Sequence, residues 1–193
     1  MSVDGILQAI MPTVMVPKFQ PFEKLSKAGN RVLISSNGVW LEIKREWLYI
    51  RTQIGPQLPV SLPYGIVEPE CRYEFGTIPV ALLNQFILAA KARLPNECAA
   101  WVIWNSVTHD WRMEMLIEAS VSAEHVNVFL PVLAENEQLV VDIHSHGAAQ
   151  AYFSATDNKD DCGECKIAYV VGNLDKDAAV VGRLCLNGYF VPL

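Results

Sequence analysis

The hydrophobic and polar positions of the first third of the chain alternate as in β-strands. Residues 31–35 and 39–44 are mostly apolar, and they flank Asn37-Gly38, a dipeptide typical of a hairpin turn. Residues 46–52 continue the pattern and can form a third strand. We therefore expect a small β-rich region over residues 1–75.

Prolines interrupt this region in two places. Pro12, Pro17 and Pro21 predict a start with little regular structure, and four more prolines fall within residues 55–71. Because proline cannot donate a hydrogen bond to a neighbouring strand, the second group predicts a loop or an edge strand.

After residue 76 the spacing of apolar residues changes to that of a helix and then to that of longer strands. Pro79 suits the first turn of a helix, and Pro95 ends the predicted helix. Its apolar face is formed by Val80, Leu83, Ile87, Ala90 and Leu94. Strands are expected over residues 98–104, 111–118, 139–146, 166–171 and 178–186, with a last short strand after Asn187-Gly188. This order predicts an α+β or mixed α/β fold around one sheet, over residues 76–193.

Composition restricts the class of protein. With 193 residues, of which 51% are hydrophobic, the chain can bury a core without disulfides, and it is not a disordered protein. No apolar run reaches the roughly 20 residues of a membrane helix, and residues 6–16, the nearest candidate, lack the basic start of a signal peptide. The net charge of −6 and the absence of a basic stripe argue against nucleic-acid binding.

The five cysteines are an odd number without an export signal, so we expect reduced thiols and a cytoplasmic protein. Cys162 and Cys165 form a C-x-x-C pair that could be redox-active or half of a structural zinc site. Because no second C-x-x-C is present, we favour thiols without a metal. The acidic run around them, Asp157, Asp160, Asp161 and Glu164, predicts a solvated helix start.

Two of only four histidines lie in the tripeptide His144-Ser145-His146, at the end of an apolar predicted strand. Residues i and i+2 of a strand share a face, so both imidazoles can meet on one cation, and imidazole pairs suit zinc. The alternative is a pair of histidines that serve packing or surface hydrogen bonds. Asp142 is expected on the same face, either as an acceptor for one imidazole or in a surface salt bridge.

Downstream residues favour the metal. Ser154 and Asp157 form the start of a predicted helix, with Ser154 as its N-cap and Asp157 in its first turn. If this helix start faces the strand, Asp157 lies beside the imidazoles. Two histidines and one aspartate leave a fourth zinc position for water, which is the arrangement of a catalytic site.

The pattern His-Ser-His-Gly, six residues, then Ser-x-x-Asp resembles the signature of the JAMM/MPN+ (JAB) zinc metalloprotease family. The resemblance covers most of residues 77–193 and implies a mostly antiparallel JAB/MPN-like sheet flanked by helices. It implies that His144, His146 and Asp157 hold Zn²⁺ and that Ser154 stabilises the oxyanion. Gly147 departs from the family, which usually has proline there.

The family also uses a glutamate near the end of its first helix, and the resemblance points to Glu97. Glu97 opens the most apolar predicted strand, where partial burial would raise the pKa of its carboxyl group toward the range useful for proton transfer. The other candidates lie on a polar strand face or in loop-like sequence: Glu114, Glu118, Glu124, Glu135 and Glu137.

The resemblance implies cleavage of peptide or isopeptide bonds after the C-terminus of a ubiquitin-like protein. We expect residues 119–137 to form a wall of the substrate groove, because they separate two predicted strands and lack a clear period. The β-rich start and the ending Asn-Gly-Tyr-Phe-Val-Pro-Leu also resemble the bacterial family called PRTRC system protein A, which implies a ThiF-like activating enzyme as a further partner. Two alternatives remain open: a non-catalytic MPN scaffold, and a JAB-type hydrolase of a small molecule.

Overall fold

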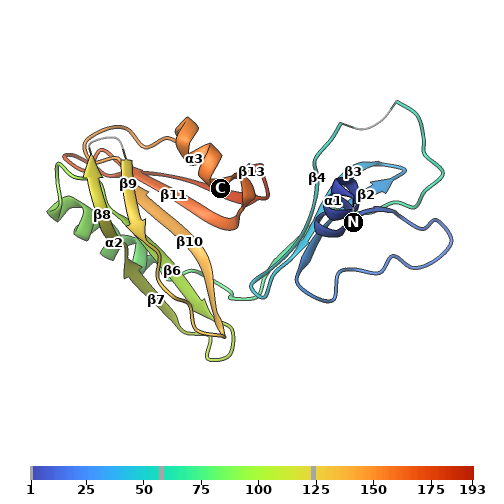
Figure 1. Ribbon diagram of the computed structural model, residues 1–193, viewed down its shortest axis with the longest axis horizontal. Helices are drawn as coiled ribbons and strands as arrows, with labels where there is room; N and C mark the ends of the chain where they lie inside the picture. The colour runs from blue at the N-terminus through green and yellow to red at the C-terminus, as the bar shows by residue number, and fades with distance from the viewer. Residues whose placement is uncertain (1, 57–58, 123–124) are drawn as a thin grey trace. The chain divides into compact units, whose positions relative to one another are not determined.

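The computed structural model describes residues 2–56, 59–122 and 125–193, with residues 118–129 described by their backbone alone. The chain forms two compact units, Met1–Gly76 and Thr77–Leu193, whose elements are labelled in Figure 1. Each unit is described by itself. Across the described residues, no helix combines the length and the apolar character needed to cross a membrane.

The first unit is built on a five-stranded sheet in which the strands follow one another in chain order. Its first pair of strands is parallel and the other pairs are antiparallel. The strands are β1 (Thr13–Met15), β2 (Gly29–Ser35), β3 (Gly38–Lys44), β4 (Leu48–Gln53) and β5 (Glu70–Tyr73). The predicted hairpin forms with Ser36 and Asn37 as its loop, because Ser35 already pairs with Gly38.

The core of this unit lies on one face of the sheet, where Val16, Leu33, Trp40 and Val67 pack together. The same face buries Glu42 completely. Glu42 is compensated by an ion pair with Arg31 and by a hydrogen bond from Tyr49 Oη at 2.8 Å. Burial, together with the neighbouring Glu42 carboxylate, raises the pKa of the Tyr49 hydroxyl.

The prediction of little regular structure at the start of the chain is confirmed for residues 16–28, which form neither helix nor strand, but it is wrong for the residues before them. Helix α1 (Val3–Ile10) forms before Pro12, and β1 follows it. The Ser2 side chain accepts the Gly5 N–H at 3.1 Å and so caps the helix. None of the three prolines lies inside α1 or β1. They therefore lie between the regular elements and do not prevent these elements from forming.

The second unit is built on a six-stranded sheet with the order β13-β12-β11-β10-β6-β7, seen in Figure 1 with α2 and α3 beside it. Its helices are α2 (Val80–Ala92) and α3 (Ala155–Asp160), and a 3₁₀ turn, η1 (Asp161–Gly163), follows α3. Its strands are β6 (Ala99–Asn105), β7 (Trp111–Met115), β10 (Glu137–Ser145), β11 (Cys165–Gly172), β12 (Ala179–Leu186) and β13 (Tyr189–Pro192). The pair β10–β11 is parallel and the other pairs are antiparallel, so the predicted α+β class with a mostly antiparallel sheet is confirmed.

The centre of this sheet is the core of the unit. On β10, Val140, Val141 and Ile143 are at most 2% exposed, and the neighbouring β6 buries Ala100 and Val102. Helix α2 contributes Phe86 and Ala90 to the buried set. Strand β10, whose end carries His144, with His146 directly after it, therefore lies at the buried centre of the unit.

The predicted strand over residues 111–118 is wrong in its second half. Strand β7 ends at Met115, and β8 (Ile117–Ser122) pairs with β9 (His125–Phe129) in a separate hairpin. The change happens at Leu116, which is 4% exposed although the alternation places it with polar residues. Its N–H donates to Ala99 O at 2.8 Å, and the chain leaves the sheet after it.

Candidate active site

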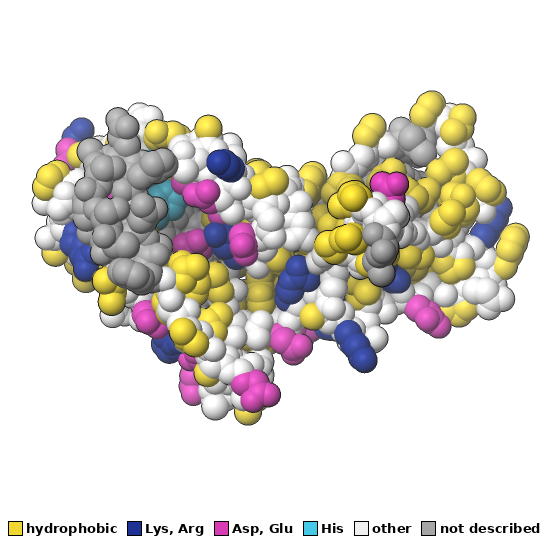
Figure 2. Space-filling view, in the orientation of Figure 1, with side chains coloured by type: hydrophobic (Ala, Val, Ile, Leu, Met, Phe, Trp, Pro, Cys, Tyr) yellow, Lys and Arg dark blue, Asp and Glu magenta, His cyan; other side chains and the backbone are white. Residues whose placement is uncertain are grey.

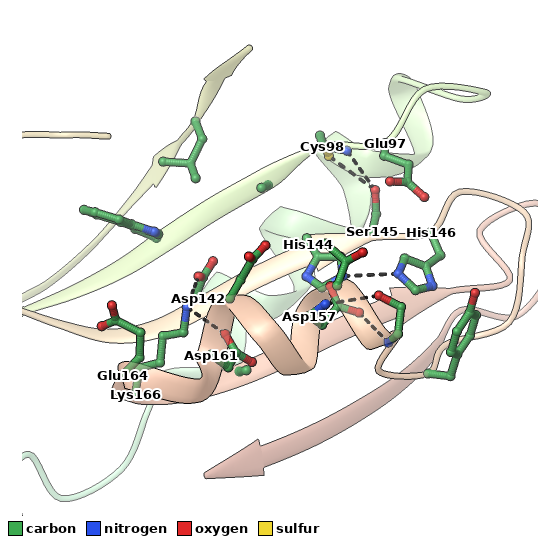
Figure 3. A pocket seen from close by; sticks show the side chains of 18 of the residues that line it. Glu97, Cys98, Asp142, His144, Ser145, His146, Asp157, Asp161, Glu164 and Lys166 are labelled. Atoms are coloured by element: carbon green, nitrogen blue, oxygen red, sulfur yellow. Dashed lines mark hydrogen bonds and ion pairs between the residues drawn. The ribbon is translucent and has the colours of Figure 1, made fainter. Parts of the chain in front are cut away.

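The two histidines lie at the end of the central strand. His144 pairs with Ala99 of β6 on one side and with Val170 of β11 on the other. Because His146 is two residues further along, its ring lies on the same face, and the two Nε2 atoms are 3.2 Å apart. Figure 3 shows both rings turned toward Asp157 of α3.

Helix α3 presents Asp157 to these rings through its capping interactions. Ser154 Oγ accepts the Asp157 N–H at 3.2 Å, and the Ser154 N–H donates to Asp157 Oδ2 at 2.6 Å. This reciprocal capping box confirms the predicted helix start. It also holds the carboxylate so that Oδ1 lies 3.4 Å from His144 Nε2.

The three side chains fit a small tetrahedral cation. One ligand atom from each of His144, His146 and Asp157 lies within 4.8 Å of the other two. A tetrahedral zinc ion with bonds of about 2.0–2.2 Å holds its ligand atoms roughly 3.3–3.5 Å apart. The 3.2 Å between the two Nε2 atoms and the 3.4 Å from His144 Nε2 to Asp157 Oδ1 match this spacing.

The protonation of the imidazoles also suits a cation. Burial lowers the pKa of His144 and so favours the neutral ring, although the Asp157 carboxylate opposes the shift. His146 Nδ1 lies 3.3 Å from Gln150 O. Since a carbonyl oxygen only accepts, this contact requires the proton on Nδ1, and in the neutral ring it leaves the lone pair on Nε2, which faces His144.

Glu97 lies beside this cluster. After an irregularity between Leu139 and Val141, β10 and β6 stay in register up to the hydrogen bond from Ser145 N to Cys98 O at 2.9 Å. This pairing places Glu97 next to His146, toward which its carboxylate points in Figure 3. Burial raises the pKa of Glu97. A proton on His146 would lower this pKa, and the Asp157 carboxylate raises it further.

These residues line a groove of about 690 Å³. In Figure 3 it runs from Glu97 and His146 to Asp142, Glu164 and Lys166, and in Figure 2 a histidine reaches the surface beside acidic side chains. Leu130 lines the groove and belongs to the predicted wall over residues 119–137. The side chains of residues 118–129, with Glu118 and Glu124 among them, lie outside the described part of the structure.

Asp142 is engaged in an ion pair. Lys166 Nζ lies 2.6 Å from Asp142 Oδ2 and 2.9 Å from Asp161 Oδ1. Lys166 is 7% exposed and Asp161 is 6% exposed. Of the two expectations for Asp142 the salt bridge forms, but with a buried partner and not at the surface.

The prediction that Asp161 belongs to a solvated helix start is wrong, because Asp161 is buried between Lys166 and Arg183. Sequence reasoning missed this network. The signal that could have found it is the single cation within each of two apolar strands, Lys166 in β11 and Arg183 in β12, because a buried charge needs a partner.

The other predicted candidates lie apart from the cluster. Cys162 is exposed and Cys165 is half-buried, and neither belongs to the group of metal-ligand side chains found among the described residues. Glu114 and Glu137 both pair with Arg112.

Gly147 adopts a φ of 56°, so the position where the family usually has proline takes a left-handed conformation that proline cannot adopt.

The model of a family described as prokaryotic homologs of the JAB domain matches residues 79–183. The chain belongs to this family. The matched range contains β6, β10 and α3, and therefore all of the residues that line the cluster. A second match, to a domain of unknown function called DUF2016, covers residues 1–74. No curated protein matches the chain.

Proposed function

We propose that this JAB-family protein is a zinc-dependent hydrolase of peptide or isopeptide bonds. The observation that carries the proposal is the spacing of His144 Nε2, His146 Nε2 and Asp157 Oδ1. Two separate elements bring these atoms together at distances that suit tetrahedral coordination. Glu97 and Ser154 line the same groove.

Zinc held by these three side chains would supply a Lewis acid for the scissile carbonyl and would lower the pKa of a water molecule. Glu97 is placed to accept a proton from the attacking water, because burial raises the pKa of its carboxyl group. The same carboxyl group can then return the proton to the leaving amine, since one residue acts as base and then as acid.

Ser154 is placed to stabilise the negative charge on the carbonyl oxygen. Its Oγ accepts the Asp157 N–H, so a lone pair is used and the hydroxyl hydrogen stays available to donate. Removal of one such donor costs roughly 10²–10³ in rate in the best-measured protease.

The substrate we propose is the C-terminal tail of a ubiquitin-like protein or its conjugate. The proposal follows from the resemblance to the JAMM/MPN+ family, and a groove of about 690 Å³ leaves room for an extended chain. A ThiF-like activating enzyme, in a bacterial cassette of the PRTRC type, is the further partner that the resemblance implies. We expect the protein to act in the cytoplasm.

The metal is tested first. Elemental analysis of protein purified without added metal or chelator should give one zinc per chain, and His144→Ala with His146→Ala should remove it. His109→Asn is the matched control, because His109 lies outside the cluster and asparagine tolerates its φ of 61°. Zinc that remains at full content in the double variant would contradict the ligand assignment.

The reaction is tested next on a panel of ubiquitin-like proteins fused through a peptide bond or joined through a lysine isopeptide bond. We expect cleavage that a chelator stops and added zinc restores. A protein without stoichiometric zinc and without cleavage of any fusion would be a binding scaffold. Cleavage restricted to small acyl compounds would reassign the substrate class.

A further inference from the structure

Helix α3 carries Asp157 and follows Ser154, yet it is not held by a core of its own. It has six residues, and none of them is buried. Isolated helices of this length are unstable in water even when the sequence favours them. The capping box supplies hydrogen-bond partners to backbone N–H groups at the start of the helix, but it does not attach the helix to the sheet. Contacts from other elements must therefore determine where Asp157 lies.

Arg183 of β12 makes those contacts. Its guanidinium group donates from Nη1 to Asn158 Oδ1, within the helix, and from Nη2 to Asp161 Oδ2 at 2.7 Å, directly after it. Arg183 is 6% exposed. Because a guanidinium group is planar and holds its donors in a fixed fork, these two bonds determine both the distance and the orientation of the helix.

Two aromatic rings hold the guanidinium group in turn. The Cζ atom of Arg183 lies 3.8 Å from the ring centre of Phe153 and 4.0 Å from that of Phe190. Phe153 directly precedes Ser154, and Phe190 belongs to β13. A cation between two ring faces is attracted by both. Arg183 thus contacts the segment 153–161 before, within and after the helix.

The charges around Arg183 are balanced and connect α3 to the histidine strand. Asp161 pairs with Arg183 and with Lys166, and Lys166 also pairs with Asp142. Asp142 lies on β10, two residues before His144 and on its face. The four side chains alternate in sign and sum to zero charge. Burial favours the neutral form of Asp161, but Arg183 and Lys166 outweigh it and hold the pKa of Asp161 below its usual range.

We propose that Arg183 is a positioning residue that holds α3 against the sheet, so that Asp157 and Ser154 face His144 and His146 before any metal binds. Its role in metal binding and turnover rests on the function proposed above. Its role in placing α3 does not, because the contacts of Arg183 are made by protein groups alone.

The test uses the full chain and compares Arg183→Met with Arg183→Lys. Methionine keeps an unbranched apolar stem between the two rings but removes the fork of donors, whereas lysine keeps the charge. In the metal-free protein we expect faster amide hydrogen exchange at residues 155–161 in Arg183→Met, with β6 and β10 unchanged. Competition with a chromophoric chelator should show zinc affinity roughly 10–100-fold weaker, as for other residues that orient metal ligands. Arg183→Lys should fall between Arg183→Met and the wild type.

Two further variants separate positioning from general stability. Leu184→Ala opens a cavity at the neighbouring position of β12, where Leu184 is 2% exposed, and it should lower the thermal midpoint without changing zinc affinity. Asn158→Ala removes one partner of Arg183 at an exposed position, so the variant should fold normally. It should still speed exchange in α3.

The outcomes distinguish the two proposals. Equal losses of zinc affinity in Leu184→Ala and Arg183→Met would overturn the positioning role, and so would unchanged exchange of α3 in both Arg183→Met and Asn158→Ala. If the wild type binds no zinc, the proposed function fails, while the exchange measurement on the metal-free protein still decides the role of Arg183.

Discussion

Ser145 and Cys98 join the end of the histidine strand to the residue that follows Glu97. Ser145 Oγ accepts the Cys98 N–H at 3.0 Å, and the Ser145 N–H donates to Cys98 O at 2.9 Å. Ser145 is completely buried. Although these two residues are 47 positions apart, they hold Glu97 and the two histidines at the same end of β6 and β10.

Glu97→Gln should lower turnover and leave zinc bound. Glutamine keeps the shape of the side chain but cannot accept the proton, so we expect a loss of roughly 10²–10⁴, the usual contribution of general acid–base catalysis. The measurements are the cleavage rate and the zinc content. Glu114→Gln is the matched control, because Glu114 lies on β7 and pairs with Arg112. If Glu114→Gln lowered the cleavage rate and Glu97→Gln left it unchanged, Glu97 would not be the general base.

Gly172→Ala should weaken metal binding from a distance. A Cβ atom at Gly172 would lie 2.3 Å from the backbone N of Ala151 and 2.4 Å from the backbone O of Ala149. The loop would have to move, and its Gln150 carbonyl accepts from His146 Nδ1. We expect a destabilisation of about 1–3 kcal/mol, as for other overpacked sites, and lower zinc affinity.

The control for Gly172 is Gly163→Ala, because a Cβ atom at Gly163 meets nothing within 4 Å. Chemical unfolding and chelator competition measure the two effects. Equal behaviour of the two alanine variants would show that the loop after His146 yields without disturbing the cluster.

The ion pair between Glu137 and Arg112 should make stability depend on acid pH. Hydrogen bonds from Arg112, and then from the Ala134 N–H, lower the pKa of Glu137 to about 2. Because an unfolded glutamate titrates near pH ~4.3, the ionised group stabilises the fold above that pH, and this contribution is lost as the pH falls toward the folded-state pKa.

Arg112→Gln should therefore raise the midpoint of the Glu137 carboxyl titration, followed by NMR on the metal-free protein, toward its ordinary value. The free energy of unfolding should also fall less steeply with acidification than in the wild type. Arg72→Gln removes a comparable exposed pair with Glu74 in the first unit and should leave the Glu137 midpoint unchanged. A midpoint that is the same in wild type and Arg112→Gln would contradict the assignment.

A chain of residues 77–193 should fold and bind one zinc, because every residue assigned to the site lies in the second compact unit. We expect residues 1–76 to contribute to the choice of partner instead. Circular dichroism and elemental analysis of the shortened chain are the measurements. A folded but metal-free product, or an insoluble one, would show that the first unit is needed for the site.

Cys162→Ser with Cys165→Ser should keep the full zinc content, because the cluster formed by His144, His146 and Asp157 contains neither cysteine. Elemental analysis of the double variant measures this. Loss of a second equivalent of metal from the wild-type value would instead reveal a structural site at the C-x-x-C pair.

Local patterns determined the elements that carry the site. The apolar run before His144 predicts a strand, and a period of two places both histidines on one face. Ser154 and Asp157 predict a capped helix start, which the structure confirms. These inferences need only residues that are close in the sequence, because hydrogen-bond periodicity and helix capping are local.

Tertiary structure decided which elements meet. The approach of Glu97 to His146 depends on the register between β6 and β10, which pairs residues far apart in the chain. The burial of Leu116 ends β7 earlier than its alternation predicts. Lys166 and Arg183 each look like an isolated cation in an apolar strand, and only the folded chain brings Asp161 between them. Burial and ion pairing depend on distance in space. The sequence by itself therefore determined the candidate ligands and their local conformation, and packing across the sheet determined how these residues are held.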